Sequence, residues 1–63
     1  METPTVTLMS RAVARAAGYE IDDDREWLLV APDGHFSFHI FEVAVSVAER
    51  YISAGLCTAV RYL

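Results

Sequence analysis

Apolar residues recur at three- and four-residue intervals from Val6 to Ala17, which is the spacing of one face of a helix. Thr3, with a proline after it, suits the N-cap of such a helix, and Gly18 suits a left-handed stop. These signals predict a helix over residues 4–17. The β-branched residues before Leu8 are also compatible with an extended start.

The period changes to two after this segment. Tyr19 and Ile21 alternate with the acidic residues Glu20 and Asp22, which predicts a short strand. Residues 26–31 form an apolar run of strand length, and residues 35–40 alternate cleanly. Pro32-Asp33-Gly34 lies between the last two segments, in the order that a tight hairpin turn prefers. The sequence therefore predicts a three-stranded antiparallel meander.

A second helix is predicted before Gly55, because Glu42, Ser46 and Glu49 belong to one polar stripe and apolar residues fill the rest. The terminal residues 58–63 are β-prone and compatible with a short fourth strand. The predicted fold class is α+β. The chain, residues 1–63, forms one small domain of order α-β-β-β-α, with the meander packed on the helices.

A three-residue hairpin loop would pair Ala31 with His35. Leu28 and Val30 would then face the helices, and Trp27 and Leu29 would lie on the other face of the sheet. A two-layer domain leaves that face to solvent, which makes these two side chains candidates for partner binding. Two alternatives remain open. A shift of one residue would exchange the faces, and one helix on each face would make the indole part of the core.

The charge is −4, from nine acidic residues against five basic ones. A chain of this charge repels phosphate backbones, which argues against direct binding of nucleic acid and favours a partner protein with a basic surface. The acidic turn that precedes Trp27 is a candidate docking site for basic side chains. The predicted partner-binding set is Trp27, Leu29, His39, His35, Asp22, Asp23, Asp24, Glu20 and Glu26.

Catalytic and metal chemistry receive little support from the sequence. His35 and His39 would point the same way on a strand but lie about 13 Å apart, which is too far for one ion. Cys57 with a histidine could form a nucleophile and base, but a structural cysteine is far commoner, and a chain of 63 residues leaves little room for a pocket that excludes water. Adjacent aspartates in a turn fan outward instead of facing each other across a cleft. We therefore predict no enzyme activity, no cofactor and no metal site.

Two family resemblances concern element order. The order over about residues 4–55 resembles the double-stranded-RNA-binding domain, but Phe41-Glu42-Val43-Ala44 stands where that family has a basic cluster. The stretch from Trp27 through Pro32-Asp33-Gly34 to Phe41 resembles the three-stranded DNA readers of phage integrase arms. It lacks their basic sheet surface. Neither resemblance therefore implies nucleic-acid binding.

The predicted function is a non-enzymatic, acidic protein–protein interaction module, and we expect it to form a homodimer. In size and charge it is similar to phage anti-defence proteins such as anti-CRISPRs, which suggests a small inhibitor that occupies a basic, nucleic-acid-binding surface. The alternative is a small homodimeric structural or regulatory subunit with no basic partner. No apolar run is long enough to span a membrane, residues 1–8 lack the basic stretch of a secretory signal, and the single cysteine favours a reducing cytoplasm.

Overall fold

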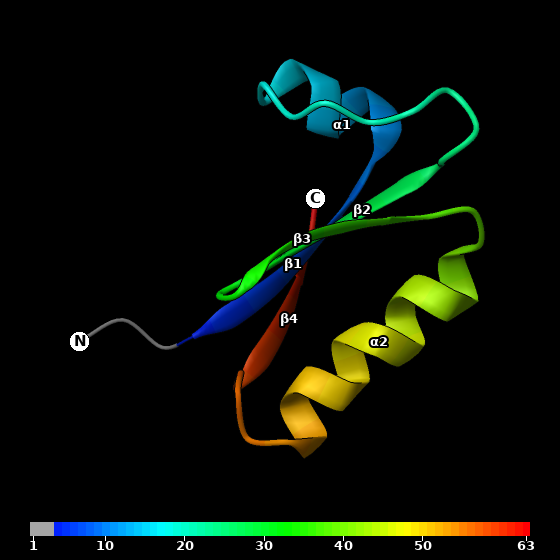
Figure 1. Ribbon diagram of the computed structural model, residues 1–63. Coiled ribbons are helices and arrows are strands. Elements are labelled where there is room, and N and C mark those ends of the chain that lie inside the picture. Colours follow the sequence, from blue (N-terminus) through cyan, green and yellow to red (C-terminus); the bar gives the residue numbers. More distant parts are fainter. Residues whose placement is uncertain (1–3) are drawn as a thin grey trace.

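A computed structural model describes residues 4–63 as a small single domain in which helices pack on a mixed four-stranded sheet. The strand order is β3-β2-β1-β4, with β1 antiparallel to β2 and parallel to β4. Figure 1 shows α1 and α2 on opposite sides of the sheet. The elements in chain order are β1 (Thr5–Ser10), α1 (Arg11–Ala16), β2 (Trp27–Ala31), β3 (Gly34–Phe38), α2 (Phe41–Ser53) and β4 (Ala59–Tyr62).

The first element differs from its prediction, because residues 5–10 form a strand and only Arg11–Ala16 is helical. The predicted N-cap, Thr3, lies outside the described residues. Ser10 caps the helix instead, with its Oγ accepting a hydrogen bond of 3.3 Å from the Val13 amide. The helix is followed by Gly18, whose φ of +94° gives the predicted left-handed stop.

The predicted strand at residues 19–21 is also corrected, since this segment is part of the connection between α1 and β2. The Tyr19 amide donates to the Ala14 carbonyl at 3.0 Å, which holds the segment against α1. Ile21 turns inward and is buried. The apolar side chain of Ile21 is therefore explained by packing in the core and not by a position in a strand.

The β2–β3 hairpin is confirmed, but its register is one residue away from the predicted one. Ala31 pairs with Gly34, so the connecting loop has two residues instead of three. Leu29 therefore lies opposite Phe36, and Trp27 opposite Phe38. Because side chains alternate strictly along a strand, this shift exchanges the two predicted faces.

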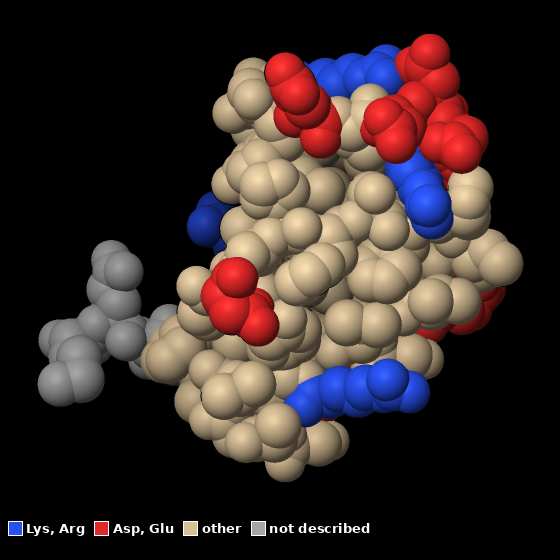
Figure 2. Space-filling model, in the orientation of Figure 1, with Lys and Arg blue, Asp and Glu red and all other residues tan. Residues whose placement is uncertain are grey.

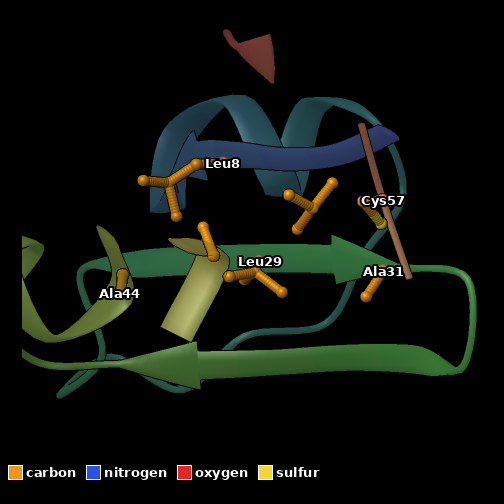
Figure 3. Close-up of a cluster of buried hydrophobic side chains, with 7 residues drawn as sticks. Leu8, Leu29, Ala31, Ala44 and Cys57 are labelled. Carbon is orange, nitrogen blue, oxygen red and sulfur yellow. The ribbon is translucent and has the colours of Figure 1, made fainter. Parts of the chain in front are cut away.

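The face that carries Leu29 is covered by α2 (Figure 3). Ala44 and Ala48 lie four residues apart and are fully buried, so one side of the helix approaches the sheet closely. The polar stripe predicted for this helix is exposed, as expected. The buried members of this first core are Val6, Leu8, Leu29, Ala31, Ala44, Ala48 and Cys57.

A smaller second core lies on the opposite face, where α1 and the following loop cover one end of the sheet (Figure 1). It consists of Met9, Ala14, Ile21 and Leu28, with Tyr19 and Val30 packed against it. Beyond this core, the register places His35, Val30, Thr7 and Arg61 in one row across the four strands. Much of that row is exposed.

The β-prone C-terminal segment forms β4, as the sequence allowed. It pairs in parallel with β1, and the amide of Thr58 donates to the Pro4 carbonyl at 3.0 Å. The Leu63 amide donates to the Leu8 carbonyl, also at 3.0 Å. Within residues 4–63, neither helix has the length and apolar character needed to cross a membrane.

Candidate interaction surface

The expected exposure of Leu29 and Trp27 on an open sheet face is wrong. Leu29 has 0% exposed surface and Trp27 is half-buried, because both lie beneath α2. The physical reason is the two-residue hairpin loop, which turns these side chains toward the helix. The alternative in which each helix covers its own face describes the structure. Leu29 is therefore a core residue and presents no surface to a partner.

Trp27 still borders the surface through an aromatic cluster at the N-terminal end of α2. Its ring centroid lies 4.7 Å from that of Phe41, and the Phe41 centroid lies 6.4 Å from that of Tyr62 on β4. Tilted rings at these separations attract each other beyond the burial of their area. The cluster joins the helix to the outer strand, and it leaves Phe41 and Tyr62 exposed.

Large apolar side chains are exposed mainly around α2. Of the eight such residues in the described chain, six lie on this helix, beside its ends or on the strand faces that it covers. Val43 is 48% exposed although it lies within the helix. We call this set the α2 apolar surface, and it consists of Phe36, Ile40, Phe41, Val43, Leu56 and Tyr62.

An open cavity of about 270 Å³ lies where the C-terminal half of α2 meets the β2–β3 turn. Val47, Ala54 and Leu56 give it a largely apolar lining. The Tyr51 hydroxyl donates a hydrogen bond of 2.8 Å to Asp33 Oδ1 at its edge. This bond to the carboxylate is the main reason that the pKa of Tyr51 is raised above its usual value of 10.0.

The predicted acidic residues, by contrast, lie together in the loop between α1 and β2. Figure 2 shows acidic and basic groups side by side at the α1 end of the molecule, with fewer charges over the rest of this view. Arg15 forms an ion pair of 2.6 Å with Asp23, and Arg11 forms one of 3.5 Å with Glu26. These arginines also donate to main-chain carbonyls of the same loop.

Arginine pairing divides the acidic set into two groups. A hydrogen bond from Arg15 and its positive charge hold the pKa of Asp23 below the usual 3.8. Glu20, Asp22 and Asp24 are exposed and form no ion pair within residues 4–63. Part of the predicted docking charge is therefore neutralised by the chain itself, and the remainder is available to a partner.

The two predicted histidines are both exposed. His35 lies on β3, on the face that α1 partly covers, and its ring meets Tyr19 edge-on at 5.4 Å between centroids. His39 follows the end of β3. Across the described part of the chain, no three histidine, cysteine or acidic side chains gather into a group that could hold a metal ion. Compared with known proteins, the chain matches no family model, no curated protein and no solved structure.

Sequence reasoning missed most of the α2 apolar surface. Phe36 lies on the sheet face that α2 covers, but β3 is an outer strand and leaves its ring exposed. From the sequence, Phe41 and Val43 were considered only for their lack of basic charge. A usable signal was present in the helix, whose apolar positions span more than half of its circumference. A helix of this kind buries one side against its sheet and leaves the flanks apolar and exposed.

Proposed function

We propose that this protein is a non-enzymatic protein–protein interaction module that binds its partner through the α2 apolar surface. The observation that carries the proposal is the gathering of six exposed apolar side chains around one helix of a 63-residue chain. Single exposed apolar residues are ordinary, whereas six of them on the flanks and at the ends of one helix favour an interaction site. Aromatic residues such as Phe41 and Tyr62 are also enriched in interface cores.

The half-buried indole supports the same surface. Trp27 anchors Phe41 at 4.7 Å, so the exposed aromatic ring is held in place before any partner arrives. Side chains fixed in advance lose less conformational entropy on binding than free ones. The surface is thus better organised for binding than its exposure alone implies.

The test uses two variants that each add one carboxylate to α2. Val43→Glu places it in the α2 apolar surface, and Ser46→Glu, the matched control, places it on the polar stripe. We expect the wild-type protein either to double its mass in light scattering or to retain a specific protein from lysate. Val43→Glu should lose that association, and Ser46→Glu should keep it. A wild-type chain that does neither, or association that Val43→Glu leaves intact, contradicts the proposal.

A second candidate function is binding of a basic protein surface, as an inhibitor of nucleic-acid binding would require. It is favoured by the exposed carboxylates of Glu20, Asp22 and Asp24, which no arginine of the described chain neutralises. Such binding should weaken steeply as salt is raised, because exposed charges are screened within about 10 Å at 0.1 M. Replacing the three carboxylates by amides should abolish it, while association through the α2 apolar surface should persist.

A further inference from the structure

The sheet has two outer strands, β3 and β4, and they differ in how well they are protected against pairing with another chain. We propose that two copies of this chain pair antiparallel through their β3 strands, about a two-fold axis that passes beside Phe36. The inference rests on the proposed function and names a second copy as the partner. The two sheets would form one continuous sheet, with the α2 apolar surface beside the interface. We call this pairing of the two β3 strands the β3 joint.

An outer strand presents unpaired main-chain groups, and natural proteins usually protect it with charges, proline, a bulge or a covering segment. β4 has four residues and carries Arg61. β3 has five residues, Gly34–Phe38, with neither an acidic residue, a lysine, an arginine nor a proline among them. Its register with β2 runs residue by residue without a bulge. β3 is therefore the less protected of the two outer strands.

The symmetry of an antiparallel pair also favours β3. A two-fold axis perpendicular to the sheet keeps both α2 helices on one face, so each residue must meet a residue of the same face. When the axis lies at Phe36, the middle residue of the five, every residue of β3 meets a residue of the same face in the second copy's β3. In β4 an axis at Arg61 would place two guanidinium groups opposite each other, and an axis at Val60 would leave Tyr62 without a partner inside the strand.

The side chains that meet across the proposed joint are compatible. Phe36 is 43% exposed and would lie opposite its own copy, which is a favourable aromatic pair. His35 would lie opposite the second copy's Ser37. Within Gly34–Phe38 no two like charges are opposed, so this register creates no charge conflict.

One flank of α2 extends the apolar surface next to this edge. Val47 and Tyr51 line the cavity together with Asp33, the residue that precedes β3. Val43 lies four residues before Val47 and so continues the same flank along the helix. Two copies joined at β3 would bring these flanks close on one face of the continuous sheet. Apolar side chains left exposed in one copy would then be withdrawn from water.

The first test compares the two outer strands. Phe36→Lys places like charges opposite each other at the axis, while the aliphatic part of lysine preserves local packing. Ala59→Lys is the matched control on β4, where the alanine is exposed and lies outside the α2 apolar surface. We expect light scattering to give twice the 7.0 kDa chain mass for the wild-type protein and for Ala59→Lys, and the chain mass for Phe36→Lys. Dissociation of Ala59→Lys alone would overturn the proposal.

A second test does not depend on how well Phe36→Lys folds. Phe36→Cys and Ala59→Cys proteins are treated with a short thiol-reactive cross-linker, with the wild-type chain as control because its Cys57 is buried. Cβ atoms directly opposite in an antiparallel pair lie about 4.5–5.5 Å apart. Phe36→Cys should therefore give covalent dimers rapidly, and the other two proteins should not. Equal cross-linking in all three would overturn the proposal.

The two proposals fail in distinguishable ways. A wild-type chain that stays monomeric, yet retains a lysate protein that Val43→Glu loses, refutes the β3 joint and supports the interaction module. A dimer that survives Phe36→Lys but not Val43→Glu also refutes the joint and retains the surface. A chain that neither dimerises nor retains a protein refutes both.

Discussion

The two sides of the sheet hold their helices by different means. Beneath α2 the contact is apolar, with Ala44 and Ala48 set against Leu29. On the opposite side the six-residue α1 covers only one end of the sheet, and Arg11 and Arg15 bind it to the following loop through carbonyls and carboxylates. A helix of six residues is too short to be stable through helix propensity alone. The short helix therefore depends on polar contacts together with the small core around Ala14, whereas the long helix depends mainly on burial.

The largest expected effect tests the apolar side. Leu29→Ala removes a fully buried side chain beneath α2, and a truncation of this kind costs about 2–5 kcal/mol of unfolding free energy. Leu28→Ala, the neighbouring substitution on the α1 side, should cost less because that smaller core borders the open row of the sheet and can relax. Urea denaturation of both variants gives the comparison. An equal or greater loss for Leu28→Ala would show that the smaller core is packed as tightly.

A smaller effect tests the polar side through pH. The pKa of Asp23 is lowered in the folded chain, chiefly by its hydrogen bond with Arg15, so the unfolded chain takes up a proton first as pH falls. The resulting stability is present above the ordinary value of 3.8 and is lost as pH falls through the folded pKa. Thermal unfolding across this range should show the loss in the wild-type protein and a reduced loss in Asp23→Asn.

Arg15→Gln serves as the reciprocal variant for that measurement. It removes the positive charge that lowers the pKa of Asp23, and should therefore flatten the acid limb of the stability curve to a similar extent. Stability in Asp23→Asn should also respond less to added salt, since exposed ion pairs are screened. If the acid limb is unchanged in both variants, the arginine contacts do not hold this loop.

The smallest expected effect concerns the polar contact between α2 and the hairpin. The hydrogen bond to Asp33 raises the pKa of Tyr51, so its contribution is present below pH 10.0 and is lost as pH rises through the folded pKa. Absorbance titration should show that Asp33→Asn moves the pKa of Tyr51 toward its ordinary value. Tyr51→Phe should delete that step and lower stability slightly at neutral pH. A titration curve that Asp33→Asn does not change would exclude the bond in solution.

The sequence predicted well those elements whose signals are local. The polar stripe of α2, the hairpin around Pro32-Asp33-Gly34 and the stop at Gly18 all depend on neighbouring residues, and each is found in the structure. The strand at the N-terminus was missed because Val6 and Met9 fit a helical spacing as well as a strand. The alternation of Thr5, Val6, Thr7 and Leu8 was the competing signal, and tertiary pairing with β2 and β4 decides between them.

The candidate site was less predictable because it depends on one residue of register. Whether Ala31 pairs with Gly34 or His35 determines which face of β2 meets α2, and both pairings are consistent with the same turn residues. The three aspartates lie in a connection, as predicted, but Glu20 and Glu26 were predicted in strands and lie in the same loop. No local signal indicates that Arg11 and Arg15 neutralise part of this set. Those contacts join residues eight to fifteen positions apart, through a loop without a regular period.

The parallel pairing of β1 with β4 has a consequence for how the chain assembles. Thr5 lies beside Ala59, so β1 acquires its second neighbour only after residues 59–62 have been synthesised. Until then β1, which carries Val6 and Leu8, is an outer strand whose main-chain groups are unpaired along one edge. Contacts between such distant parts of a chain form late and slow the folding reaction. The nascent chain therefore passes through a stage in which β1, an inner strand of the finished sheet, can pair with other chains.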